Sequence, residues 1–340
     1  MKPSTFAGLI VAAAVVGTLA VTAYSVNNRV ARPKATGSPL IANLASRGQQ
    51  VARIEIRQGE SVVALARGPQ GWVLANRDGY PARAEPLKAL LVRLAEADLV
   101  EPKTRVPDRF GLLELEDPAL KGAKSRLVRL SDEKGSAIAE VIVGKKRLDA
   151  FGASRSGTYV RRPGDEQTWL ASADIDASAN VRDWVQAQVL DLAIAKVSVV
   201  TVEVPGEAPL RITRDAAGGG SPKFNLEGLA ADKKLKEGAN VEAIARAAVT
   251  LDLDDVRKAD AAAKPDAGTV TIESDGGLSV KLALRKAGDD TWATIAASGE
   301  GDGKAQAEEI AKRTAGWEFK LPSGKAAGIL KRRADLVEGS

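Results

Sequence analysis

The feature that most constrains the fold of this chain is an internal repeat. The segment that begins VARIEIRQG at Val51 has a counterpart that begins VSVVTVEV at Val197, 146 residues later. In both segments, apolar runs of strand length precede one amphipathic helical stretch. The offset grows to 154 residues because a GGGS loop and a lysine-rich turn are inserted, and insertions in turns are typical of structural repeats. We therefore expect one folding unit to occur twice.

The pattern of apolar residues in each copy predicts short strands followed by a helix and a hairpin. Ile54 and Ile56 alternate with polar residues in the first strand, and the stretch 84–99 carries leucines on one helical face. A hairpin follows, with its turn at 134–135 in the first copy and at 276–277 in the second. This order indicates mainly antiparallel sheets covered by helices.

The tryptophans support the same interpretation. Four of the five are expected in matching pairs, Trp169 with Trp292 in strands and Trp184 with Trp317 in a closing helix of each copy. Large rings close the gap between a sheet and its covering helix. We interpret these rings as core packing rather than as ligand-stacking platforms.

The amino-terminal run 6–23 contains no charged residue. A helix over this run would span about 27 Å, close to the roughly 30 Å hydrocarbon core of a bilayer. This predicts a transmembrane anchor; the alternative is a cleaved signal peptide, because Val21 and Ala23 are small enough for a cleavage site. The charges on the two flanks nearly balance and do not fix the orientation. We expect a single-pass protein of the inner (cytoplasmic) membrane with its soluble part in the periplasm or at the cell exterior.

The expected fold class is α+β: an N-terminal transmembrane helix followed by two repeated lobes, each a mainly antiparallel β-sheet covered by helices. The expected boundaries are 1–26 for the transmembrane anchor or signal-like helix, 27–50 for a linker, 51–195 for the first repeat lobe, 196–322 for the second repeat lobe and 323–340 for a basic C-terminal tail.

Composition limits the chemistry of the chain. The 340 residues include no histidine and no cysteine, so the commonest metal ligands, the usual neutral-pH proton shuttle and the thiol nucleophile are missing. We expect no catalytic residues, no cofactor, no metal site and no enzyme activity. The 49 basic and 44 acidic residues are spread along the chain, which is not typical of a nucleic-acid-binding protein.

Two polar motifs resemble ligand sites only in part. The glycines at 218–220 lack the following lysine and serine or threonine of a phosphate-binding loop, so we interpret them as a plain loop. Asp252, Asp254 and Asp255 resemble the start of a calcium loop, but the glycine and the closing glutamate that such a loop requires are missing.

Three further charged groups are predicted to be solvated. Asp165 with Glu166, and Asp289 with Asp290, lie in expected hairpin turns beside basic residues. The basic run 331–333 is interpreted as a solvated chain end; the alternative is contact with acidic lipid headgroups, at about 1 kcal/mol per basic residue.

The segment 99–120 has no clear periodicity and is long for an ordered loop. It mixes prolines and basic residues with apolar side chains. Two interpretations remain open: the segment wraps the core as a strap, or it presents an apolar patch to a partner. The candidate partner-contact residues are Phe110, Leu112, Leu113 and Leu115.

The ordered features ARIEIRQG, GWVLAN, TYVRR and RDWV resemble the domain of unknown function 4340 family. The resemblance extends from Val51 to about Pro322. It implies an extracytoplasmic, membrane-anchored accessory component, similar to proteins found beside gliding-motility-type ABC transporters. It provides no functional residues to carry over. The chain has no multi-span permease region and no nucleotide-binding loop, so it corresponds to the accessory part alone.

The expected function is that of a non-catalytic, membrane-anchored extracytoplasmic accessory or scaffold subunit of a membrane assembly, of an ABC-type transport or gliding-motility-like kind. Its expected partners are permease or ATPase subunits, with membrane contact through the N-terminal helix. The alternative is an extracytoplasmic glycan- or peptide-binding module that uses the cleft between the two lobes.

Overall fold

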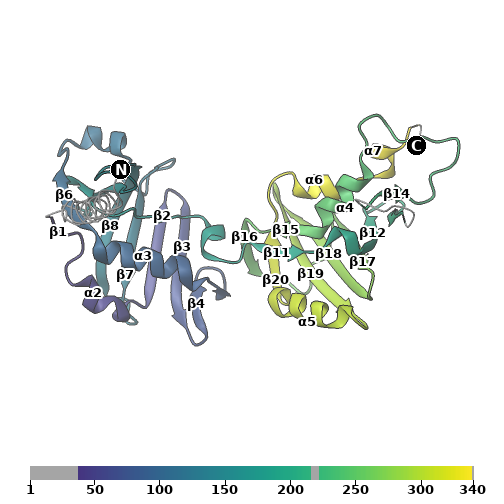
Figure 1. The fold of residues 1–340 in the computed structure, drawn as a ribbon, viewed down its shortest axis with the longest axis horizontal. Coiled ribbons are helices and arrows are strands. Elements are labelled where there is room, and N and C mark those ends of the chain that lie inside the picture. Colours follow the sequence, from purple (N-terminus) through teal and green to yellow (C-terminus); the bar gives the residue numbers. More distant parts are fainter. Residues whose placement is uncertain (1–36, 216–221, 339–340) are drawn as a thin grey trace, which may run out of the picture.

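The computed structural model describes residues 37–215 and 222–338. Two wide antiparallel sheets lie side by side along the long axis of the molecule, and a small two-stranded sheet lies next to the eight-stranded one (Figure 1). We refer to each wide sheet with its covering segments as the first and the second lobe. The residues that connect them, 172–196, are the connecting segment.

The first lobe contains a ten-stranded sheet in the order β1-β6-β10-β9-β8-β7-β2-β3-β4-β5. Its strands are β1 (Ser38–Pro39), β2 (Arg53–Gln58), β3 (Ser61–Gly68), β4 (Gly71–Leu74), β5 (Tyr80–Pro81), β6 (Asp98–Pro102), β7 (Arg126–Ser131), β8 (Ala137–Arg147), β9 (Gly157–Arg161) and β10 (Thr168–Ala171). Its helices are α2 (Leu44–Arg47), α3 (Ala84–Glu96) and the 3-10 helices η1 (Gly48–Gln50) and η2 (Pro107–Leu113).

The second lobe contains an eight-stranded sheet in the order β14-β13-β12-β17-β18-β19-β20-β16. Its strands are β12 (Val197–Glu203), β13 (Leu210–Arg214), β14 (Phe224–Leu226), β16 (Asp255–Lys258), β17 (Gly268–Ser274), β18 (Leu278–Ala287), β19 (Asp290–Gly299) and β20 (Trp317–Lys320). Its helices are α4 (Val241–Val249), α5 (Gly303–Thr314), α6 (Lys325–Ile329) and α7 (Arg333–Leu336).

The two wide sheets have the same topology. The order β4-β3-β2-β7-β8-β9-β10-β6 in the first lobe corresponds strand for strand to β14-β13-β12-β17-β18-β19-β20-β16 in the second. The helix α3 follows β4 and its short neighbour β5 in the first lobe, and α4 follows β14 in the second. The first sheet adds β1 and β5 at its edges. The repeat seen in the sequence is therefore a repeat of topology.

The burial pattern explains why each sheet carries a helix. In β2, Ile54 and Ile56 are buried while their neighbours are not, so one face of the strand is apolar. On α3, Leu87, Leu90 and Leu94 are buried and occupy one side of the helix, which packs on that face of the sheet. In the second lobe, the helix α4 buries its apolar side in the corresponding core.

The expected fold class requires a correction. The predicted transmembrane helix falls on residues 6–23, which lie outside the described residues. Within the described ranges, every helix is too short or too polar to cross a bilayer. The structure therefore does not support an N-terminal transmembrane helix, and the architecture that it does support is three antiparallel sheets with covering helices.

The predicted pairing of the tryptophans is also wrong in part. Trp317 lies in the strand β20 and not in a helix. The counterpart of β20 in the first lobe is β10, which carries Trp169, so these two rings occupy equivalent strands. Trp292 lies in β19, and Trp184 lies in the 3-10 helix η3 (Val181–Trp184) of the connecting segment.

The segment between β6 and β7 covers the face of the first sheet that lies opposite the main core. Phe110 and Leu115 are buried there against Ile142, with Leu113 half-buried beside them. The guanidinium of Arg161 lies 4.7 Å from the ring centre of Phe110. Phe110, Leu113 and Leu115 therefore pack as expected for a strap that wraps the core. We call the segment between β6 and β7 the strap. Leu112 points to solvent and is 68% exposed.

The corresponding face of the second sheet carries a charged cluster instead of a strap. Glu318 in β20 is only 3% exposed, and it accepts hydrogen bonds from Arg257 at 2.8 Å and from Arg285 at 2.9 and 2.6 Å. Hydrogen bonding to this carboxylate raises the pKa of Arg285. The guanidinium of Arg257 also stacks 3.7 Å from the ring centre of Trp292. The buried carboxylate is thus neutralised by two arginines.

The two lobes are joined where an edge of each sheet meets the other lobe. Arg77, in the turn before β5, donates from Nε and Nη2 to the two carboxylate oxygens of Asp255 in β16, at 2.6 and 2.8 Å. In the same strand, the backbone N–H of Lys258 donates to Asp78 Oδ2 at 3.2 Å. A bidentate pair of this kind fixes orientation as well as distance.

The connecting segment adds a second set of contacts at this junction. Arg182 in η3 donates to Asp254 Oδ1 at 2.7 Å. The strand β11 (Gln188–Asp191) pairs antiparallel with β15 (Thr250–Asp252) and forms the small third sheet. Asp254 and Asp255, two of the three aspartates that resemble a calcium loop, are therefore engaged with arginines across the junction.

Aromatic rings also meet at the junction. Tyr80 in β5 lies edge-on to Trp317 in β20, with ring centres 4.9 Å apart and planes at 88°. It also meets Phe319 edge-on at 6.2 Å. Edge-to-face pairs of this kind contribute about 0.5–1.5 kcal/mol beyond the area that they bury. Burial raises the pKa of Tyr80, and the charge of Arg313 opposes this shift.

The carboxyl-terminal residues fold onto the second lobe. Leu336 and Val337 are buried, and the backbone N–H of Lys236 donates to the Leu336 carbonyl at 2.8 Å. Arg333 donates to the carbonyl of Gly228. The interpretation of 331–333 as a solvated chain end is wrong for Arg333, because this residue is tied to the lobe.

We predict that Phe110→Ala will destabilise the protein by about 3–5 kcal/mol, because it empties a buried ring position beneath the strap. The matched variant Leu112→Ala should change the free energy of unfolding by less than about 0.5 kcal/mol, because Leu112 is exposed. Urea denaturation of the two variants measures the difference. An equal loss of unfolding free energy in the two variants would contradict the packing of the strap on the sheet.

We predict a pH-dependent contribution of Tyr80 to stability. Below about pH 10 the phenol is protonated in both the folded and the unfolded state. Above about pH 10 the unfolded chain loses this proton first, because burial raises the pKa of Tyr80 in the folded state. The free energy of unfolding therefore falls as the pH rises. Tyr80→Phe retains the ring but removes the titrating group. The free energy of unfolding of the wild type, relative to Tyr80→Phe, should therefore fall between about pH 8 and about pH 11 in urea denaturation. A difference that does not change with pH would contradict this assignment.

Candidate functional site

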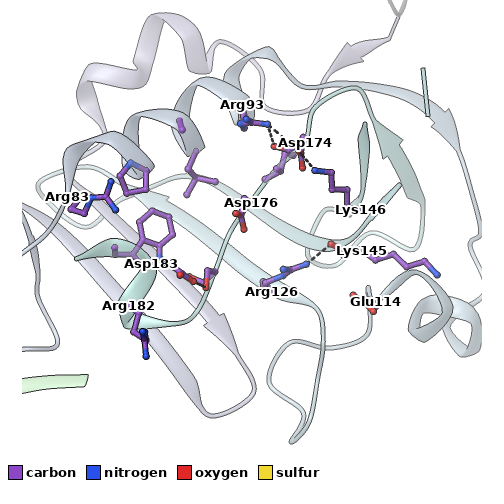
Figure 2. Close-up of a pocket in the computed structure, with 17 residues that line it drawn as sticks. Arg83, Arg93, Glu114, Arg126, Lys145, Lys146, Asp174, Asp176, Arg182 and Asp183 are labelled. Carbon is purple, nitrogen blue, oxygen red and sulfur yellow. Dashed lines mark hydrogen bonds and ion pairs between the residues drawn. The ribbon is translucent and has the colours of Figure 1, made fainter. Parts of the chain in front are cut away.

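A basin of about 760 Å³ opens on the first lobe between α3, the end of β8 and the connecting segment. We call it the α3 basin. Figure 2 shows charged side chains from several elements directed toward it. The residues that line the basin are Arg83, Pro86, Ala89, Leu90, Arg93, Glu114, Arg126, Gly144, Lys145, Lys146, Asp174, Ile175, Asp176, Ser178, Arg182, Asp183 and Trp184.

One wall of the basin depends on a close approach between the strap and β8. A Cβ atom on Gly144 would lie 2.3 Å from the carbonyl oxygen of Leu113 and 2.9 Å from that of Glu114. Real side chains do not tolerate such distances, so only glycine allows the strap to lie here. Glu114 itself adopts a left-handed backbone conformation with φ of 56°. This wall therefore places Glu114 beside Lys145 at the rim.

The central cation of the basin is Arg126, at the start of β7. It donates from Nη2 to the carbonyl of Gly144 at 2.6 Å. Its Nε is buried, and no hydrogen-bond acceptor for it is present among the described residues. In Figure 2 the guanidinium lies below Asp176, with Asp183 on one side and Lys145 on the other. Arg126 is therefore held in place by one bond while its donors remain incompletely satisfied.

The upper rim is an ion-pair cluster centred on one carboxylate. Asp174 accepts from Lys146 Nζ and lies 3.6 Å from Arg93 Nη1. Arg93 also donates to the Asp174 backbone carbonyl at 2.7 Å. Two cations thus share a single carboxylate, which leaves an excess of positive charge at this rim.

The connecting segment forms the wall opposite β8. The ring of Trp184 is buried, and its Nε1 donates to the carbonyl of Ser178 at 2.8 Å. The backbone N–H of Arg83, just before α3, donates to the carbonyl of Trp184 at 2.7 Å. Asp183 accepts from the hydroxyl of Ser178. These bonds fix the wall on which Arg83 and Asp183 stand.

Two other cavities lie near the basin. One of about 740 Å³ follows the other side of Arg93 along α3 and reaches Arg155. The other, of about 420 Å³, lies at the junction of the lobes and is lined by both, with Glu60 and Arg77 from the first and Asp254 from the second. A cavity is therefore present between the lobes, and three of its four charged lining residues, Arg77, Asp254 and Asp255, already form ion pairs.

The residues that the sequence singled out do not gather in the basin. Of the four candidate partner-contact residues, three are strap residues that pack against the first sheet: Phe110, Leu113 and Leu115. The turn charges lie elsewhere: Asp165 holds its own turn by accepting from the Gln167 N–H, and Asp290 pairs with Lys320 at 2.8 Å. The glycines at 218–220 lie outside the described residues.

The sequence reasoning missed the cations of the basin. Arg83, Arg126 and Arg182 are isolated in the sequence and converge only through the fold. One local signal was available: Gly144 is followed by the run Lys145, Lys146 and Arg147 at the end of an otherwise apolar strand. A basic run that ends a buried strand places several cations at one end of a sheet.

The sequence matches the family described as Domain of unknown function (DUF4340) over residues 72–271. The chain belongs to this family. The matched span covers more than half of the chain, from β4 through the junction into β17, and includes every lining residue of the α3 basin. A comparison with curated proteins found no match. A comparison with solved structures found none either.

Proposed function

We propose that this protein is a non-catalytic accessory subunit that acts outside the cytoplasm as a scaffold of a membrane assembly, of an ABC-type transport or gliding-motility-like kind. The lack of histidine and cysteine supports a role in binding rather than in catalysis. The large, open and charged α3 basin supports contact with a partner or ligand. The resemblance to family members beside such transporters supports the kind of assembly.

The observation that carries this proposal is the junction between the lobes. The bidentate pair of Arg77 with Asp255 and the edge-on rings of Tyr80 and Trp317 hold two repeats of one unit in a single orientation. A body that presents two fixed surfaces suits a part that holds other subunits at a set spacing. The exposed Leu112 on the strap offers an apolar contact point on the first of these surfaces.

Site-specific photo-crosslinking in cells tests this role. A photoreactive amino acid placed at Leu112, on the exposed side of the strap, should form adducts with a permease or ATPase subunit, identified by mass spectrometry. The same amino acid at Lys134, which is exposed in a hairpin turn of the same lobe, serves as the matched control for nonspecific capture. Adducts that never contain a transporter or motility subunit, from Leu112 or from other exposed positions, would contradict the proposal.

A second function is favoured by one observation, the 420 Å³ cavity lined by both lobes. It corresponds to a glycan- or peptide-binding module that uses the cleft. We expect such a module to be stabilised by its ligand, with a melting temperature that rises with ligand concentration. Melting curves of the purified chain with polysaccharides and short peptides test this alternative. A rise that Asn180→Ala removes would support it, because Asn180 lines the cavity; no rise with any of them would contradict it.

A further inference from the structure

We propose that the α3 basin binds a small amphoteric group: a phosphate or carboxylate oxyanion at Arg126 with an ammonium donor next to it at Asp176. This inference is independent of the accessory role, because it concerns a ligand site that the first lobe and the connecting segment form.

Arg126 has unused hydrogen-bonding capacity. Its single bond, from Nη2 to the Gly144 carbonyl, uses one of five N–H donors, and its Nε has no acceptor among the described residues. A buried donor without an acceptor costs roughly 1–3 kcal/mol. An oxyanion in the basin supplies charged acceptors for the donors of Arg126 that the bond to Gly144 leaves free.

The basin contains unpaired charges of both signs. Six cations and four carboxylates line the basin. Arg182 is already paired with Asp254 of the second lobe, and Asp174 is shared by Arg93 and Lys146. The ion pairs of the basin within the described residues are those of Arg93, Lys146 and Arg182. The lining cations that remain without a carboxylate partner there are Arg83, Arg126 and Lys145, and the lining carboxylates without a cation partner are Glu114, Asp176 and Asp183.

Equal numbers of unpaired charges of both signs decide the class of ligand. A simple anion would gain from Arg126 and Lys145 but would be repelled by the nearby Asp176 and Glu114. A simple cation would gain from Asp176 and Glu114 but would be repelled by Arg126 and Lys145. A molecule that carries both an oxyanion and an ammonium group satisfies both sets, because Asp176 and Arg126 line the same basin and Asp176 is drawn above the Arg126 guanidinium (Figure 2).

The rigidity of the site supports binding rather than a chance gathering of charges. Arg126 is fixed to Gly144, and the opposite wall is fixed by the buried Trp184. Positions that are held before a ligand arrives cost less to order on binding. The volume of about 760 Å³ accommodates a group of this size together with part of a larger molecule.

Melting of the purified full chain, at an ionic strength held constant with sodium chloride, tests the proposal. O-phosphoethanolamine and glycylglycine are the amphoteric probes, one with a phosphate and one with a carboxylate. Inorganic phosphate and ethanolamine are the single-charge controls. We expect a rise in melting temperature with at least one amphoteric probe and a smaller rise or none with either control. The probe that binds identifies the oxyanion.

Three variants locate the site. Arg126→Gln and Asp176→Asn should each weaken binding of the effective probe by about tenfold, the loss expected for one charge-assisted hydrogen bond. Arg129→Gln, on the same strand but paired with Glu140 on the opposite face, should leave binding unchanged. Because Asp176 is exposed, its variant remains informative even if Arg126→Gln alters the fold. Inorganic phosphate binding as tightly as the amphoteric probes, or binding that neither basin variant weakens, would overturn the proposal, as would the absence of any shift.

Discussion

An open antiparallel sheet leaves an unpaired strand at each edge, and the arrangement of this protein depends on how two such edges are covered. The edge strand β5 of the first sheet contains Pro81, which has no N–H to offer, and it places Tyr80 against the second lobe. At the edge strand β16, the Lys258 N–H is satisfied by the Asp78 carboxylate of the first lobe. Each lobe therefore protects one edge of the other, and the polar groups that would otherwise attract foreign strands hold the lobes together.

The repeated unit has diverged most on the face that its own helix does not cover. In the first lobe the long connection from β6 to β7 forms the strap, which buries Phe110 and Leu115. In the second lobe the corresponding connection is short, and the cluster of Glu318 with two arginines occupies the equivalent face. The strap also builds a wall of the α3 basin through its contact with Gly144. The basin is thus built by the first lobe and the connecting segment, without lining residues from the second lobe, which explains how two similar units can carry different roles.

The sequence predicted the elements whose signals are local. The alternation around Ile54 and Ile56 and the leucine face of α3 identified a strand and a helix, because burial imposes these periods directly. The prediction of a helix at Trp317 was wrong, although aromatic and charged residues alternate over the four residues of its strand. The alanine-rich helix α5 was not predicted, because Ile310 is its single large apolar residue. The junction and the basin were beyond local reasoning: Arg77 and Asp255 lie 178 residues apart, and topology alone brings them together.

A distance measurement between the lobes tests most directly whether the junction holds the two repeats as one body. Because the chain has no cysteine, spin labels can be attached cleanly at Lys134→Cys and Asp289→Cys, in exposed turns of the first and second lobe. Pulsed electron paramagnetic resonance should then give one narrow distance distribution. The distribution should broaden when Arg77→Ala and Arg182→Ala remove the ion pairs with Asp252, Asp254 and Asp255. A broad distribution in the unaltered junction, or one that these substitutions leave narrow and unshifted, would contradict the account.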